Sequence, residues 1–243
     1  MKVRRLISSP LLIAIGFGLT VFADQAGTVR ANPAEGEVIA NWKLASFVDN
    51  GVEDEVSGAK LFISQGLRED GQKRPVPAVE EAAGVVGLRF GEGQVLLGKT
   101  VGIPGLEEGF FAGNQPFSAK VVFVVLGPPV GNYGVLLDIG HYMRTGVNLL
   151  LEKETMRILM RINDGEKAHR ALGPTSLEEG KVYTADILFD GSHTTLLLDG
   201  EFECMSDIVP LPFDQTFSIG SGNGDRYWFN GVISEISISR PKR

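Results

Sequence analysis

The sequence predicts an all-β protein, arranged as a sandwich or a barrel of many short strands. Three observations indicate this fold class. Apolar and polar residues alternate over about eight residues at 155–162, which is the pattern of a strand with one face in a core. Asp-Gly pairs, which tolerate the positive φ angles of tight hairpin turns, occur at 164–165, 190–191 and 199–200. No stretch has the apolar spacing of an amphipathic helix.

The first 23 residues predict an export signal. A basic start precedes an apolar run from Leu11 to Phe22, and Val21 and Ala23 occupy the −3 and −1 positions of a cleavage site. The run is about 12 residues long, whereas a membrane-spanning helix needs about 20. An uncleaved N-terminal anchor is the alternative. The predicted layout is a signal peptide at 1–23, a linker at 24–36 and one β domain at 37–240.

The net charge excludes one class of partner, and the cysteine content indicates a cellular compartment. Of the 23 basic residues three lie in the signal, which leaves 20 against 30 acidic residues and a mature net charge of −10. Such a surface repels phosphate backbones, so we expect no nucleic-acid partner. Cys204 is the single cysteine and cannot form an internal disulfide, which favours a bacterial periplasm or exterior for an exported domain. No segment after the signal predicts a membrane span.

The first part of the β domain predicts few strands. Residues 38–44 indicate a first strand at a sheet edge. Residues 49–82 are rich in Gly, Asp, Glu and Pro, so we expect long loops with little regular structure there. Two short strands are predicted at 85–90 and 94–97, separated by a Gly-Glu-Gly turn.

From residue 117 onward the β pattern is strong. Residues 119–126 form a β-branched apolar run that ends at Gly127-Pro-Pro, which is typical of a strand covered on both faces. At 155–162 the apolar positions alternate with Arg157 and Arg161, so these arginines should point away from the core. The other predicted strands are 133–139, 147–151, 183–190, 194–198, a segment beginning at 201, 217–220 and 231–239.

The closing segment resembles that of laminin-G-like domains. In residues 217–238 a strand ending in Ile-Gly leads through a polar loop to Phe229-Asn-Gly231 and a hydrophobic strand. Trp42-Lys-Leu44, residues 54–58, Gly87-Leu-Arg-Phe90 and residues 117–123 resemble earlier motifs of the family in order and spacing. This resemblance covers nearly the whole of 37–240. It implies a two-sheet antiparallel jelly roll of the concanavalin A-like lectin-glucanase superfamily.

One departure from the family concerns the last strand. Many relatives carry Asp after its hydrophobic residues, where this chain has Ser234 before Glu235, so no role tied to that Asp is carried over. We expect Phe229 and Trp42 to pack in the core. Gly220 and Gly231 should permit a turn or a close approach of the backbone.

No catalytic motif is recognisable in the sequence. Glycoside hydrolases with this fold carry Glu-x-Asp-x-x-Glu on one strand, and no Glu here is followed two positions later by Asp. There is no Gly-x-Ser-x-Gly elbow, and His141, His169 and His193 lack the spacing of a triad. No His/Cys set has zinc spacing. The sequence therefore predicts no catalytic residue.

Two stretches combine aromatic and polar side chains in the way that sugar binding requires. The predicted ligand-binding residues are Asp138, His141, Tyr142, Arg144, Asp225, Tyr227 and Trp228. If Phe229 points inward, Trp228 should point outward, because neighbours in an extended chain alternate. The alternative is that Trp228 caps the sandwich edge and Tyr142 packs over a loop. Calcium is a candidate ion by the resemblance; Asp138, Asp164 and Asp225 lie at strand ends, where each also fits an ordinary turn residue.

Three functions are compatible with these residues. The first is a non-catalytic lectin-like module that binds carbohydrate or another extracellular ligand. The second is a structural or adhesion module of the cell envelope. The third is a glycoside-active enzyme with an atypical site. All three agree with a periplasmic or extracellular location.

Overall fold

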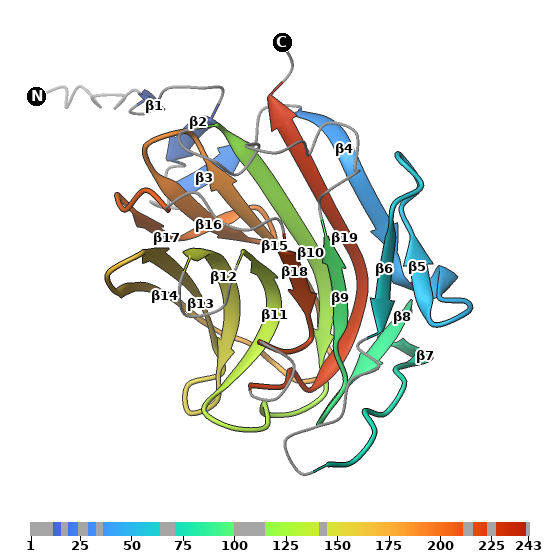
Figure 1. The fold of residues 1–243 in the computed structure, drawn as a ribbon. Coiled ribbons are helices and arrows are strands. Elements are labelled where there is room, and N and C mark those ends of the chain that lie inside the picture. The colour runs from blue at the N-terminus through green and yellow to red at the C-terminus, as the bar shows by residue number, and fades with distance from the viewer. Residues whose placement is uncertain are drawn as a thin grey trace, which may run out of the picture.

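The chain forms two antiparallel β-sheets that pack face to face (Figure 1). The computed structural model describes residues 12–15, 19–23, 29–32, 36–63, 71–99, 115–140, 145–210, 216–222 and 227–241. The strands are β1 (Leu12–Ile15), β2 (Leu19–Ala23), β3 (Val29–Asn32), β4 (Gly36–Lys43), β5 (Gly51–Glu53), β6 (Lys60–Ile63), β7 (Ala78–Ala82), β8 (Val85–Phe90), β9 (Leu96–Lys99), β10 (Phe117–Val125), β11 (Tyr133–Ile139), β12 (Thr145–Glu152), β13 (Arg157–Asp164), β14 (Ala168–Ser176), β15 (Val182–Phe189), β16 (Thr194–Leu198), β17 (Glu201–Ser206), β18 (Thr216–Ile219) and β19 (Gly231–Pro241).

The strand order defines two layers. Sheet A has eleven strands in the order β1-β2-β3-β17-β16-β15-β10-β19-β8-β7, with β4 also paired to β19. Sheet B has eight strands in the order β14-β13-β12-β11-β18-β9-β6-β5. The predicted two-sheet antiparallel sandwich is confirmed. A single turn of 3₁₀ helix, η1 (Leu44–Ser46), follows β4, and no helix in the described ranges has the length and apolar character to cross a membrane.

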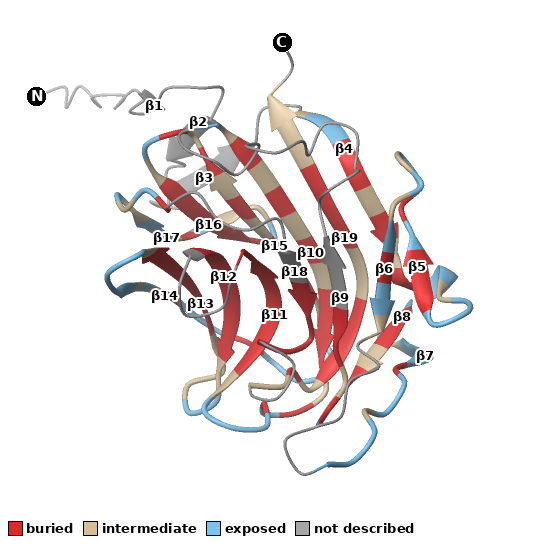
Figure 2. Cartoon of the chain, viewed as in Figure 1, coloured by how far each residue is buried: buried red, intermediate tan, exposed pale blue. Residues whose placement is uncertain are grey.

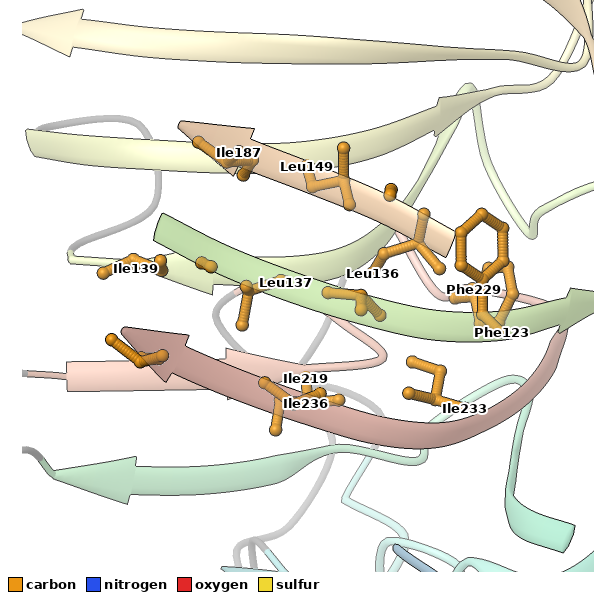
Figure 3. Packing of buried hydrophobic residues seen from close by; sticks show 14 of the residues in the cluster. Phe123, Leu136, Leu137, Ile139, Leu149, Ile187, Ile219, Phe229, Ile233 and Ile236 are labelled. Carbon is orange, nitrogen blue, oxygen red and sulfur yellow. The ribbon is translucent and has the colours of Figure 1, made fainter. Parts of the chain in front are cut away.

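The core lies between the two sheets and is filled by alternate side chains from both. Leu137 and Leu149 of sheet B belong to the same buried cluster as Ile187 and Ile236 of sheet A (Figure 3). Full burial of such a side chain stabilises the fold by about 1.5–3 kcal/mol. The regular alternation that predicted these strands therefore also defines their buried faces.

The aromatic residues of the closing and opening motifs lie in this core. Phe229 is fully buried, and its ring meets that of Phe123 edge to face at 6.0 Å. Trp42 is also buried, and its indole nitrogen donates to the Ala59 carbonyl at 3.3 Å. Both expectations for these residues are confirmed.

The two glycines of the closing motif lie where a side chain would collide with its surroundings. Gly220 has a φ of 81°, and a Cβ there would lie 2.1 Å from the Phe90 ring. A Cβ on Gly231 would lie 2.1 Å from the Val124 carbonyl oxygen. The structure thus confirms a turn at Gly220 and a close backbone approach at Gly231.

Two expectations about regular structure were wrong. Residues 49–82, predicted as loops, contain β5, β6 and β7, whose short backbone pairings need little apolar sequence. Strand β14 was not predicted, because it is an edge strand with mostly exposed side chains and shows no apolar alternation.

The N-terminal segments add three strands to sheet A. Strands β1 and β2 fall within the predicted signal peptide, and β3 falls within the predicted linker, where it pairs with β17. The cleavage site and the domain boundaries stay predictions.

Candidate ligand-binding face

The middle strands of sheet B are buried on both faces. Figure 2 shows β11, β12 and β13 coloured as buried along most of their length. The side chains on one face belong to the core, and those on the other face point away from sheet A. We call the second set the outer face; on β11 to β14 it comprises Tyr133, Val135, Asp138, Asn148, Leu150, Glu152, Arg157, Leu159, Arg161, Asn163, Arg170 and Leu172.

One half of the outer face is apolar and aromatic. Val135, Leu150 and Leu159 form a cross-strand row and are buried together in a cluster separate from the main core. The half-buried side chains of Tyr133 and Tyr227 pack against this row, with ring centroids 6.0 Å apart and planes tilted by 54°. The accessible part of this half is therefore the two tyrosine rings, and an aromatic face is what the C–H side of a sugar ring packs against.

The backbone around Tyr227 fixes its ring over β11. The Val135 amide donates to the Tyr227 carbonyl at 2.8 Å, and the Val130 amide donates to the Trp228 carbonyl at 3.1 Å. Tyr227 has a φ of 64°, which is uncommon for a residue with a side chain. The next residue but one, Phe229, then enters the core.

The other half of the outer face is a buried polar cluster. Asn148 Nδ2 donates to one carboxylate oxygen of Asp138, and Ser218 Oγ donates to the other at 3.3 Å. Arg161 Nε and Asn163 Nδ2 both donate to Asn148 Oδ1, at 3.0 and 3.4 Å. Asn148 therefore links a buried carboxylate to a buried guanidinium.

The polar cluster keeps one buried acceptor that no described residue satisfies. Asn163 is buried, and its Oδ1 receives no hydrogen bond. Buried polar atoms are nearly always bonded to protein or to water, so this oxygen is a position where a hydroxyl group would be stabilised.

Arg170 connects the two halves. It lies directly opposite Arg161 on β14, and its Nη1 donates to the Tyr133 hydroxyl at 2.9 Å. Its guanidinium carbon lies 5.2 Å from the centre of the Tyr133 ring, which is within range of a cation–π contact. Because β12 and β13 separate these two residues, the Arg170 side chain crosses the face.

A further aromatic side chain shares this side of sheet B. The backbone register places Phe62 of β6 opposite Leu97, Leu97 opposite Ser218, and Ser218 opposite Asp138. Phe62 is 53% exposed, which is unusual for an aromatic residue in a strand. It extends the outer face toward the β5 edge.

The structure brings together only part of the predicted ligand set. Asp138 and Tyr227 both lie at the outer face, at opposite ends of β11. Trp228 is half-buried and forms isolated backbone bridges with Val130 and Val135. His141, Tyr142, Arg144 and Asp225 lie outside the described residues. The sequence reasoning missed Tyr133, Arg170 and the polar partners of Asp138, since only their pairing across strands brings them together.

The described carboxylates do not form a calcium site. No group of three His, Cys, Asp or Glu side chains suited to a metal ion occurs among the described residues. Calcium needs six to eight oxygen ligands, whereas both oxygens of Asp138 already accept hydrogen bonds from neutral side chains. Asp164 is a turn residue: its Oδ1 accepts the amides of Glu166 and Lys167 at 2.9 and 2.8 Å.

Asp164 also contacts His169 of β14, in sheet B. Its Oδ2 lies 2.6 Å from His169 Nε2. The Lys167 amide, and then the His169 contact, hold the pKa of Asp164 well below its usual range. The Asp164–His169 pair lies at the β13–β14 turn, whereas the Ser218 hydroxyl bonds to Asp138. Asp164, His169 and Ser218 therefore do not form a hydroxyl–imidazole–carboxylate triad.

Comparison with known proteins identifies the architecture. No protein-family model and no curated protein sequence matches the chain. Among solved structures, domain 4 of AbnA, a GH43 extracellular arabinanase from Geobacillus stearothermophilus in complex with arabinotriose, matches with a TM-score of 0.60 and 14% identity over 85% of this chain and 94% of that domain. Trypanosoma rangeli sialidase matches with a TM-score of 0.61 and 16% identity over 90% of this chain. The likeness shows the fold, an antiparallel β-sandwich.

The β-sandwich corresponds to one part of the sialidase. The matched region spans 33% of the sialidase chain. At these levels of identity the likeness establishes the fold, and the outer face of sheet B has to be argued from its own side chains.

Proposed function

We propose that the chain is a non-catalytic, extracytoplasmic module that binds carbohydrate on the outer face of sheet B. The observation that carries the proposal is the Tyr133–Tyr227 pair, which shares the outer face of sheet B with a polar cluster. Aromatic rings next to fixed hydrogen-bonding groups are the usual composition of a sugar site. The arabinotriose bound to the similar AbnA domain agrees with this role.

The polar cluster supports the proposal through its rigidity. Asp138, Asn148 and Arg161 hold one another by hydrogen bonds on three adjacent strands, so their orientation does not depend on a ligand. A preorganised polar site loses less conformational entropy when a sugar binds. Sugar hydroxyls both donate and accept, which suits a cluster that contains carboxylate, amide and guanidinium groups.

The test is titration calorimetry with a panel of soluble polysaccharides. The protein is purified from the periplasm or medium of a bacterial host, and its mass shows whether residues 1–23 have been removed. Tyr133→Ala and Tyr227→Ala should each weaken binding of a positive polysaccharide about tenfold, since a stacked aromatic ring contributes about 1 kcal/mol or more. Phe202→Ala, which removes a 40% exposed ring from β17 in sheet A, should leave affinity unchanged.

Two results would count against the proposal. If no polysaccharide binds, the structural or adhesion role in the envelope becomes the better explanation. If Phe202→Ala weakens binding as much as the tyrosine variants do, the site is not on sheet B.

A further inference from the structure

We propose that the outer face of sheet B selects carbohydrates whose rings carry carboxylate or sulfate groups. This inference rests on the proposed carbohydrate-binding function and adds the charge of the ligand. The observation behind it is a concentration of arginine on this face of a protein whose net charge is −7.

Three arginines point outward from two adjacent strands. Arg157 and Arg161 lie on the same side of β13, and Arg170 lies opposite Arg161 on β14. On β11 to β14 the described acidic side chains of the outer face are Asp138 and Glu152. Asp138 bonds to Asn148 and Ser218, and Glu152 Oε2 accepts the Thr155 hydroxyl at 2.7 Å. Among these described side chains, the arginines therefore outnumber the carboxylates.

Arg157 is the most informative of the three. Its side chain is half-buried, its Nε is buried, and that atom has no hydrogen-bond partner in the described part of the chain. No ion pair within 4.0 Å involves its guanidinium among the described residues. A buried donor without an acceptor is unfavourable, and an anionic oxygen is the acceptor that binds a guanidinium most strongly.

Arg170 places a second charge beside the aromatic surface. One of its donors is used by the Tyr133 hydroxyl, which leaves the remaining guanidinium hydrogens for a ligand. A sugar ring stacked on Tyr133 or Tyr227 would therefore hold an acidic substituent within reach of Arg170. Guanidinium groups bind carboxylate and sulfate through paired hydrogen bonds, which neutral hydroxyls do not match in strength.

The experiment compares ligands that differ in charge. Binding to the full chain is measured by calorimetry for polygalacturonate, dextran sulfate, neutral linear arabinan, neutral dextran and inorganic polyphosphate. We expect polygalacturonate or dextran sulfate to bind at least about tenfold more tightly than both neutral polymers and than polyphosphate. The two acidic polymers show whether carboxylate or sulfate is the preferred group.

Variants locate the effect on the face. Arg157→Gln and Arg170→Gln should each weaken binding of the acidic polysaccharide about tenfold and reduce its salt dependence. Arg157→Lys and Arg170→Lys are controls that keep the positive charge. The melting temperatures of the variants show whether weaker binding comes from a loss of folding. The matched control is Lys181→Gln, because Lys181 also stacks on a tyrosine, with Nζ 5.1 Å from the Tyr183 ring centre, but directly precedes β15 of sheet A.

The outcomes separate this inference from the proposed function. Equal or tighter binding of arabinan or dextran would overturn the charge preference and leave carbohydrate binding intact. Polyphosphate binding as tight as that of the acidic sugars would also overturn it, since charge alone would then suffice. Failure of every polysaccharide to bind would overturn both the charge preference and the proposed function. If Lys181→Gln weakens binding as much as Arg170→Gln does, the arginines of sheet B do not form the site for the acidic group.

Discussion

Gly220 illustrates how a single residue without a side chain shapes the closing loop. Its positive φ alone would cost an alanine about 1–2 kcal/mol, and the Phe90 ring occupies the space that a Cβ would need. The two effects act together at Gly220. At Gly180, where φ is 76° and nothing lies within 4 Å, only the first acts.

We predict that Gly220→Ala lowers the free energy of unfolding by about 3 kcal/mol or more. The control Gly180→Ala should lower it by only about 1 kcal/mol. Urea denaturation of the two variants measures the difference directly. Equal losses would mean that Phe90 moves aside at no cost.

At the scale of the elements, the edge strand β14 of sheet B is tied to β17 of sheet A by a buried carboxylate. Glu203 of β17 in sheet A is buried, and its Oε2 accepts the Thr175 amide of β14 in sheet B at 3.1 Å. Next to it, Cys204 Sγ lies 3.4 Å from the Ala171 carbonyl, and burial, followed by the Glu203 charge, raises the pKa of this thiol to about 12.

We predict that Glu203→Ala lowers the free energy of unfolding by about 1–3 kcal/mol, because the Thr175 amide loses its charged acceptor. Hydrogen exchange should accelerate at Thr175 while amides in the centre of β12 keep their protection. Glu178→Ala, at a largely exposed carboxylate, is the control. Unchanged exchange at Thr175 would show that β14 and β17 do not depend on this contact.

The strands that could be predicted from sequence are those whose apolar period reports a buried face. Residues 133–139 and 194–198 were predicted with the bounds of β11 and β16, because apolar residues dominate both segments. Strands β5, β6, β7 and β14 could not be found in this way. Strands β7 and β14 are stabilised by backbone pairing while most of their side chains face solvent, and β5 and β6 are only three and four residues long.

The residues of the candidate site could likewise be predicted only in part from the sequence. Asp138 and Tyr227 could be proposed from local composition, since each lies near aromatic and polar neighbours in the sequence. The partnership of Arg170 with Tyr133 spans 37 residues and depends on the register of four strands. Register is a long-range property, so single-sequence patterns do not contain it.

For the whole molecule, two acidic side chains on the outer side of sheet A, Asp186 and Glu235, change the folding stability in opposite directions as the pH varies. Burial raises the pKa of Asp186 to about 6, against the attraction of Lys120. Burial also acts to raise the pKa of Glu235, but hydrogen bonds from Lys43 and Lys120 lower it below its ordinary value. Lys120 lies opposite Asp186 on the neighbouring strand, and its Nζ is 3.2 Å from Glu235 Oε1.

The sign of each effect follows from which state binds the proton more tightly. Folded Asp186 holds its proton more tightly than the unfolded chain, whose value is near 3.8. Its contribution to stability is complete below about pH 4 and is lost as the pH rises through about 6. Glu235 behaves oppositely: its contribution is present above the unfolded pKa and is lost as the pH falls through the folded one.

We predict that Asp186→Asn removes a decline in stability between about pH 4 and pH 6, worth at most about 3 kcal/mol. Urea denaturation at half-unit pH steps provides the measurement. Glu235→Gln should leave this window unchanged and instead reduce the loss of stability in acid. Parallel curves for wild type and Asp186→Asn from pH 4 to pH 7 would contradict the prediction.

The position of β19 in sheet A has a consequence for how the chain folds. This strand pairs with β10 on one side and with both β4 and β8 on the other, yet it follows all three in the sequence. During synthesis the edges of β4, β8 and β10 that pair with β19 therefore stay unpaired until β19 has left the ribosome. Such distant pairing slows folding, because the entropy of closing long loops is lost before these contacts form.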